Sequence, residues 1–149
     1  MIAFLDACAL IYKIEGAEPF ASSTSKVLGE LATSHPKIGT SISRLTWLEC
    51  RVGPMKSNNQ ELLQKYDAVF ALPDLKWIEL SQVVVELAAH IRAAHGLKTP
   101  DSLQAASCLQ LGKGHVFLTG DPAFSRVAGL NVRLLSYPLR KNFATLLCK

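Results

Sequence analysis

Residues 2–6 read Ile-Ala-Phe-Leu-Asp, and this stretch decides how the rest of the chain is interpreted. The first four residues form a wholly apolar run of strand length, which is typical of a strand buried on both faces in a parallel sheet. Asp6 ends this run, where a carboxylate loses water at a high cost in free energy. No lysine or arginine adjoins Asp6 in sequence to offset its charge. The stretch therefore predicts a buried strand that leads directly into a functional carboxylate.

Helical and extended patterns alternate along the rest of the chain. Further strands are expected over 37–42, 75–80, 115–119 and 130–135. Expected helices cover 7–14, 20–34, Ser43 to about Val52 before Gly53-Pro54, Asn58 or Asn59 to the break at Pro73-Asp74, Ser81 to Gly96, Thr99-Pro100 to Gly112, and a short helix from Pro122. This order predicts an α/β fold, a three-layer sandwich with a central, mostly parallel sheet of four to five strands flanked by helices. At 149 residues, a single domain over 1–149 is expected.

Three further acidic residues occupy places where apolar ones are usual, namely Glu49, Asp101 and Asp121. Glu49 shares a helical stripe with Leu45, Leu48 and Val52, so it is expected to point with apolar side chains. Asp101 lies in the first turn of an expected helix, and Asp121 follows an expected strand. Functional crevices of open α/β sheets lie outside the carboxyl ends of the strands, where all four acids can meet. Such a group calls for a cation, and a hard divalent metal is the simplest one.

Each acid also has an ordinary structural explanation. Asp121 precedes Pro122 and can cap a helix, while Asp101 can complement a helix dipole. Glu49 can pair with a distant basic side chain. Asp6 is the hardest to explain in this way, because a charge that ends a buried strand needs a reason. Taken together, the four acids favour one site at one edge of the sheet.

The charge balance favours a polyanionic partner. The chain carries 16 basic and 12 acidic residues. If the four acids are neutralised in one pocket, the 16 basic side chains face only eight acidic ones on the remaining surface, and that field attracts polyanions such as nucleic acid. A pI near 9.0 is also common among small soluble proteins, so charge alone does not decide between these interpretations.

The cysteine pattern and the N-terminus indicate a cytoplasmic protein. The four cysteines are widely spaced, with no C-x-x-C pair, so a zinc site and a disulfide framework are poorly supported; Cys8, Cys50 and Cys108 are interpreted as small core residues. The apolar start contains Asp6 and no basic leader, which argues against a signal peptide. No apolar run approaches the roughly 18 residues of a membrane span, so no membrane partner is expected.

The four acidic motifs resemble those of PIN-domain ribonucleases. The motifs are Phe-Leu-Asp6-Ala-Cys-Ala-Leu-Ile-Tyr, Ser-Arg-Leu-Thr-Trp-Leu-Glu49-Cys-Arg-Val, Thr-Pro-Asp101-Ser-Leu-Gln-Ala-Ala and Leu-Thr-Gly-Asp121-Pro-Ala-Phe. Within that superfamily, the length and the order of the motifs are similar to those of VapC toxins from bacterial toxin–antitoxin pairs. The resemblance covers residues 1 to about 135. Two positions depart from the family pattern: Cys8 stands where Ser or Asn is frequent, and Gly120 where Asn is frequent.

The resemblance implies a PIN fold and an Mg²⁺- or Mn²⁺-dependent endoribonuclease that a cognate antitoxin protein inhibits. It implies that Asp6 and Asp101 are the main metal ligands and that Glu49 and Asp121 complete the acidic pocket. It further implies that Thr119 supports the pocket by hydrogen bonding. A homodimer and an RNA substrate follow from the same resemblance.

Two other functions are compatible with the sequence. One is a phosphatase with Asp6 as nucleophile, although such an enzyme usually has a second carboxylate two residues on, where this chain has Cys8. The other is a non-catalytic RNA-binding or scaffold module with the PIN fold, which would have no need to retain four mutually repelling acids. We therefore expect a nuclease.

Candidate partner-binding residues are less specific. Basic side chains near the acids in sequence are candidates for holding RNA, with a solvated surface charge as the alternative for each: Arg44, Arg51, Lys98, Lys113 and Arg126. His95 and His115 are interpreted as capping or core residues rather than as acid–base catalysts. Apolar residues on the helices 7–14 and 20–34 are expected to offer a groove to an antitoxin segment: Ile11, Tyr12, Ile14, Phe20, Val27 and Leu31. The segment after Tyr137 is a candidate tail for RNA or a partner.

Overall fold

The computed structural model describes residues 1–135, and its centre is a five-stranded sheet in the order β3-β2-β1-β4-β5. The strands are β1 (Ile2–Leu5), β2 (Gly39–Ser43), β3 (Leu75–Ile78), β4 (His115–Thr119) and β5 (Val132–Leu134). Each neighbouring pair is parallel, and Ile2 of the central strand is in register with Gly39 on one side and His115 on the other. The α/β class and the parallel sheet predicted from the sequence are confirmed. The proposed tail after Tyr137 lies outside the described residues.

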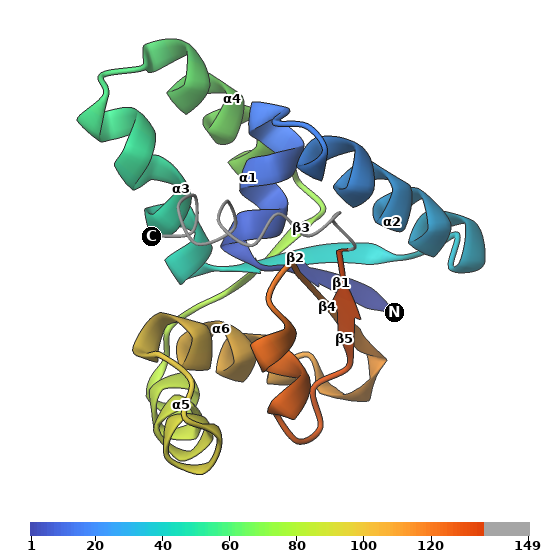
Figure 1. Ribbon diagram of the computed structural model, residues 1–149, viewed down its shortest axis with the longest axis vertical. Coiled ribbons are helices and arrows are strands. Elements are labelled where there is room, and N and C mark those ends of the chain that lie inside the picture. Colours follow the sequence, from blue (N-terminus) through green and yellow to red (C-terminus); the bar gives the residue numbers. More distant parts are fainter. Residues whose placement is uncertain (136–149) are drawn as a thin grey trace.

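Helices cover both faces of the sheet and complete three layers (Figure 1). One face carries α1 (Ala7–Glu15), α2 (Phe20–Ser34), α3 (Arg44–Lys56) and α4 (Gln60–Phe70). The other carries α5 (Gln82–His95) and α6 (Thr99–Leu109), with the short 3₁₀ helices η1 (Gly112–Gly114) and η2 (Pro122–Arg126).

Alternation along the central strand divides the core between the two faces. Ala3 and Leu5 belong to the apolar cluster under α1 and α2, whereas Phe4 belongs to the cluster under α5 and α6. Successive side chains of a strand point to opposite faces, so a wholly apolar strand feeds both clusters at once. Burial of β1 on both faces therefore fixes Asp6 at its carboxyl end.

Capping residues set most helix boundaries where the sequence predicted them. Ser43 accepts a hydrogen bond from the Thr46 amide (3.2 Å), and Asn59 accepts one from the Leu62 amide (3.0 Å). Gly16 ends α1 in the left-handed conformation, at φ 74°.

Two predicted helix ends were wrong. α3 continues past Pro54 to Lys56, because a proline in the last turn removes only one helical hydrogen bond and the amides of Ser57 and Asn59 still reach the Gly53 and Pro54 carbonyls. α6 ends at Leu109 and not at Gly112, which instead begins η1 with a φ of 71°.

His115 has the core role that the sequence predicted for it. His115 is buried at the start of β4, where its Nδ1 contacts the Gly112 carbonyl and its Nε2 accepts a hydrogen bond from the Asn131 amide (3.0 Å). This is the amino edge of the sheet, opposite to the end that carries Asp6. His95 lies in the last turn of α5, where a basic side chain complements the helix dipole.

The prediction of small core cysteines holds in part. Cys50 and Cys108 are buried and free. Cys8 is only half-buried and lines the cleft described below, so it is not a core residue as expected. Within residues 1–135, no helix combines the length and the apolar character that crossing a bilayer requires.

Phe117 is expected to be the most sensitive core position on the face of α5 and α6. Its ring lies 5.5 Å from that of Phe4 and 4.6 Å from that of Phe124, centroid to centroid. Phe117→Ala should lower the free energy of unfolding by about 3–5 kcal/mol in urea denaturation, because the site cannot collapse around the cavity. Val83→Ala, at a position that is 60% exposed, is the control and should change it by less than about 0.5 kcal/mol. Equal losses in the two variants would contradict this packing.

Candidate functional site

Asp6 is held where β1 meets α1 by hydrogen bonds to both carboxylate oxygens. Its Oδ1 accepts a hydrogen bond from the Ala7 amide (2.8 Å), and its Oδ2 accepts one from the Thr119 hydroxyl (2.8 Å). The Asp6 amide donates to the Leu118 carbonyl (3.0 Å), which ties the residue to the end of β4. Asp6 is only 6% exposed. The hydrogen-bonding contact expected of Thr119 is present, and it fixes the direction of the Asp6 side chain.

Thr119 also organises the loop that carries Asp121. Its Oγ1 accepts a hydrogen bond from the Asp121 amide (3.1 Å), so one buried hydroxyl joins the Asp6 carboxylate to this loop. The Asp121 side chain is exposed and caps η2 by accepting a hydrogen bond from the Ala123 amide (2.8 Å). The structural role considered for Asp121 is therefore present, and it leaves the second carboxylate oxygen available to the site.

Glu49 faces the site from α3, although for a different reason from the one inferred from the sequence. The stripe of Leu48 and Val52 is not buried, since these side chains are 51% and 39% exposed. The buried face of α3 is formed instead by Thr46, Cys50 and Pro54. Glu49 is half-buried, and its Oε2 accepts a hydrogen bond from the side-chain amide of Gln104 (3.0 Å).

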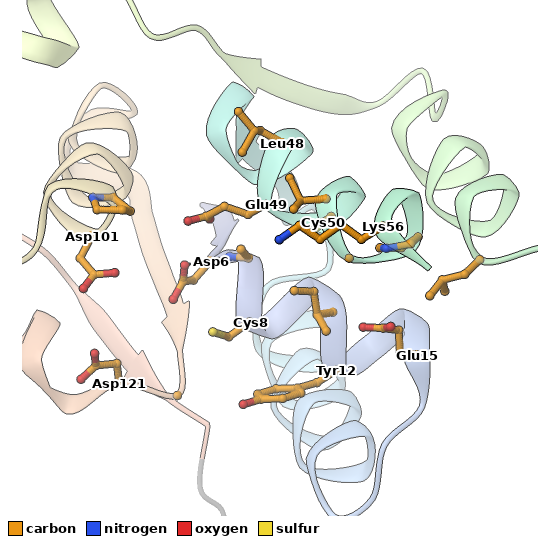
Figure 2. A pocket seen from close by; sticks show the side chains of 18 of the residues that line it. Asp6, Cys8, Tyr12, Glu15, Leu48, Glu49, Cys50, Lys56, Asp101 and Asp121 are labelled. Atoms are coloured by element: carbon orange, nitrogen blue, oxygen red, sulfur yellow. Dashed lines mark hydrogen bonds between the residues drawn. The ribbon is translucent and has the colours of Figure 1, made fainter. Parts of the chain in front are cut away.

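The four acids line one cleft of about 1010 Å³, together with residues of α1 and α3 and the start of α6. Figure 2 shows Asp6 and Glu49 side by side on one side of this space, with Asp101 and Asp121 across from them. They come from segments far apart in the sequence: the end of β1, the middle of α3, the first turn of α6 and the loop after β4. The convergence expected at the carboxyl edge of the sheet is present.

Burial and mutual repulsion raise the pKa of three of these carboxyl groups. Burial raises the pKa of Asp6 to about 7; the Thr119 hydrogen bond opposes this rise, and Glu49 and Asp101 add to it. The pKa of Glu49 is raised by burial and by Asp101, against the hydrogen bond from Gln104. The pKa of Asp101 is raised by burial and by Asp121, against the charge of Lys98. The cleft therefore concentrates negative charge that is only partly compensated.

The donor chemistry of the cleft fits a hard divalent cation. All four candidate ligands offer carboxylate oxygens, which Mg²⁺ and Mn²⁺ prefer, and no histidine lines the cleft. Among residues 1–135, no three acidic, histidine or cysteine side chains lie close enough to hold one ion as they stand. Binding of a cation would therefore require the carboxylate side chains to rotate toward each other. The cation would offset the repulsion between them.

A family model for the PIN domain matches residues 3–130. The chain belongs to the PIN-domain family. The PIN fold expected from the four acidic motifs is thereby confirmed, with the motifs at the carboxyl edge of the sheet. No curated protein matches this PIN domain closely enough in sequence to count as a relative.

Several solved structures share the fold of this PIN domain. VapBC2 from Rickettsia felis, bound to a promoter DNA fragment, matches with a TM-score of 0.71 at 20% identity, over 91% of this chain and 100% of that one. A toxin–antitoxin complex from Klebsiella pneumoniae matches with a TM-score of 0.65 at 25% identity, over 90% and 98%. FitAcB from Neisseria gonorrhoeae matches with a TM-score of 0.66 at 20% identity, over 89% and 96%.

Two of the five basic residues considered for RNA binding, Arg44 and Arg51, are paired with acidic side chains. Arg44 forms an ion pair with Glu79 (2.5 Å), and Arg51 forms one with Asp67. Each guanidinium also stacks on a tryptophan, that of Arg44 on Trp77. Of the five basic candidates, Lys98 alone lines the cleft.

Lys56 and Gln104 were missed by the sequence analysis. Lys56 lines the arm of the cleft between α1 and α3, but it lies beyond Gly53-Pro54, where the helix was expected to have ended. Gln104 lies three residues after Asp101 on α6. That spacing places both on one helix face, and it is the signal that could have identified Gln104.

Asp6 should make the stability of the metal-free protein depend on pH. Because its pKa is raised from 3.8 to about 7, the folded chain keeps a proton that the unfolded chain releases between these values. Stability should therefore fall as the pH rises from about 4 to about 7 and level off above that. Asp6→Asn cannot ionise, so in EDTA it should melt several degrees above the wild type at pH 8, with little difference at pH 4. The exposed Asp74→Asn is the control; if Asp6→Asn melts below the wild type at pH 8, the assigned repulsion is wrong.

Proposed function

We propose that this PIN domain is a divalent-metal-dependent endoribonuclease and the toxin of a toxin–antitoxin pair. The observation that carries the proposal is the meeting of four carboxylates from separate segments in one cleft at the carboxyl edge of β1 and β4. Burial and mutual repulsion raise the pKa values of these acids, so holding them together is unfavourable unless a cation binds between them. The fold shared with toxin–antitoxin structures supports the biological part of the proposal.

The chain's own residues would divide the work of phosphodiester hydrolysis. Asp6 and Asp101 would hold Mg²⁺ or Mn²⁺, which when bound lowers the pKa of a water molecule and neutralises phosphate charge. Thr119 fixes the Asp6 carboxylate, and Glu49 and Asp121 complete the negative wall of the cleft. Lys98 lines the cleft near Asp101 and would contact a phosphate of the RNA backbone.

The two alternative functions are less well supported by the contacts. A phosphatase with Asp6 as nucleophile usually has a second carboxylate two residues on, and this chain has the half-buried Cys8 at that position. A non-catalytic RNA-binding module would be expected to surround its cleft with available cations, whereas Arg44 and Arg51 are paired with acidic partners. We therefore prefer the nuclease.

Removal of a main metal ligand should abolish cleavage. Asp6→Asn and Asp101→Asn each remove one negative charge from the cleft while keeping the shape of the side chain, and each should lower kcat for Mn²⁺-dependent RNA cleavage by at least about 100-fold. EDTA should stop the wild type, and Mg²⁺ or Mn²⁺ should restore it. Asp74→Asn, an exposed aspartate in the turn before β3, is the matched control and should keep full activity. Unchanged cleavage by both cleft variants would refute the proposed site.

An antitoxin protein is the proposed partner, but the surface expected for it needs correction. Of the apolar residues expected on the helices 7–14 and 20–34, Ile11 and Tyr12 line the cleft, whereas Val27 is buried in the core and does not. Further exposed apolar side chains lie on α3 beside the cleft, where Leu48 is 51% and Met55 is 60% exposed. We propose that the antitoxin covers this face and closes the cleft. A homodimer and a cytoplasmic location remain predictions from the same resemblance.

Met55 should report on antitoxin binding without touching the acidic site. If the product of a small adjacent reading frame is the antitoxin, Met55→Glu should weaken the complex by about tenfold or more, because a buried methionine contributes about 1.5–3 kcal/mol. Val83→Glu on α5 has the same exposure, 60%, on the opposite layer and serves as the control. Titration calorimetry of the two variants measures the difference. Equal affinities would show that the partner binds elsewhere.

A further inference from the structure

Gln104 is a fully buried polar residue behind Glu49, one of the acids that line the cleft. It lies on α6 and is 1% exposed. Its Nε2 donates to the Thr46 hydroxyl (3.0 Å) and to Glu49 Oε2 (3.0 Å), and its Oε1 accepts a hydrogen bond from the Ser43 hydroxyl (2.7 Å). Both amide hydrogens and the carbonyl are therefore used. A buried hydrogen-bond network stabilises the fold only when its donors and acceptors have partners, and those of the Gln104 amide do.

The orientation of the Gln104 amide follows from its partners. Ser43 caps α3 by accepting the Thr46 amide, so its own hydroxyl hydrogen is available to donate to the Gln104 carbonyl. With the carbonyl on that side, the NH₂ group must face Thr46 and Glu49. A flipped amide would place its carbonyl oxygen against the Glu49 carboxylate, where both groups are acceptors. Ser43 and Thr46 therefore aim the donor at Glu49.

Gln104 lies on the helix that carries Asp101 and forms a hydrogen bond to Glu49 on another helix. It follows Asp101 by three residues on α6, so the two side chains share one helix face. Its amide reaches across to α3, where Glu49 is the acceptor. Glu49 has no buried apolar stripe to orient it, because Leu48 and Val52 are exposed. The hydrogen bond from Gln104 is the contact that directs its carboxylate toward Asp101.

We propose that Gln104 is a positioning residue that holds the Glu49 carboxylate at a fixed place relative to Asp101 for cation binding. The inference rests on the proposed metal-dependent function. Glutamine suits this place because it donates a hydrogen bond without neutralising the acid: a lysine would compete with the cation, and a glutamate would add a further negative charge. Mutation of a residue that forms a hydrogen bond to a metal ligand typically lowers metal affinity or activity by about 10- to 100-fold.

The test compares Gln104→Met, Glu49→Gln and the double variant with the wild type. Methionine keeps the length of the side chain and removes the donor. Mn²⁺ affinity is measured by calorimetry without RNA, and kcat and KM for RNA cleavage are measured separately. Gln104→Met should weaken Mn²⁺ binding by about 10-fold or more and lower kcat more than it changes KM. The double variant should be no worse than Glu49→Gln alone, because Gln104 acts through Glu49.

Two further variants separate positioning from packing. Ser107→Ala, at another buried polar position on α6 whose hydroxyl bonds only the Leu103 carbonyl of its own helix, should leave Mn²⁺ affinity and kcat unchanged. Thr46→Val removes one anchor of the Gln104 amide and should weaken Mn²⁺ binding in the same direction but less. If Gln104→Met does not fold, as judged by thermal unfolding, Thr46→Val decides the question.

Failure of this inference differs from failure of the proposed function. If the wild type cleaves RNA and Asp6→Asn does not, but folded Gln104→Met binds Mn²⁺ and cleaves as the wild type does, the positioning role is overturned and the nuclease stands. Additive losses in the double variant would also overturn it. If the wild type cleaves no RNA with either metal, the nuclease falls, and the Mn²⁺ titrations alone decide the role of Gln104.

Discussion

The burial of the Asp6 carboxylate at the end of the central strand is the constraint on which the rest of the structure depends. β1 is apolar on both faces, so its carboxyl end lies deep in the protein, and the charge placed there has to be held by the Ala7 amide and the Thr119 hydroxyl. Two hydrogen bonds reduce the cost of removing a carboxylate from water, but they do not remove it, and burial still raises the pKa of Asp6 to about 7. The neighbouring acids raise it further. A divalent cation bound in the cleft would offset this repulsion.

The two edges of the sheet have different roles. At the amino edge, His115 joins η1 to the start of β5 through Gly112 and Asn131, and these contacts are satisfied within the protein itself. At the carboxyl edge, Thr119 donates a hydrogen bond to Asp6 and Gln104 donates one to Glu49, and these two acids carry charge that their surroundings compensate only in part. The amino edge of the sheet thus contributes to stability, whereas the carboxyl edge carries the candidate site, as is general for ligand sites of parallel α/β sheets.

Much of the fold could be predicted from the sequence because local signals agreed with the tertiary arrangement. The apolar run before Asp6, the caps at Ser43, Asn59 and Ser81, and the glycines after α1 and α5 each fix one boundary by local physics. The errors arose where tertiary contacts decide the outcome. Pro54 is buried inside α3, where the sequence predicted the end of the helix. The stripe that contains Leu48 and Val52 was expected to be buried, but it is exposed. Pairing of Arg44 with Glu79 joins residues 35 apart, so no local pattern reveals that this cation is engaged.

Charge distribution gives the cleft its selectivity for what approaches it. Five acidic and two basic side chains line the cleft, whereas the whole chain has a net charge of +4, so the residues outside the cleft carry a net charge of +7. A free polyanion is attracted by the general surface but repelled at the acids, whereas a divalent cation is attracted at the acids alone. The two ligands therefore depend on each other: a cation in the cleft removes the repulsion that opposes a phosphate backbone, and the phosphates add ligands for the cation. By linkage, RNA and metal should each raise the affinity for the other by the same factor. For the proposed nuclease, this asymmetry between a negative cleft and a positive surrounding surface would make RNA binding depend on the metal.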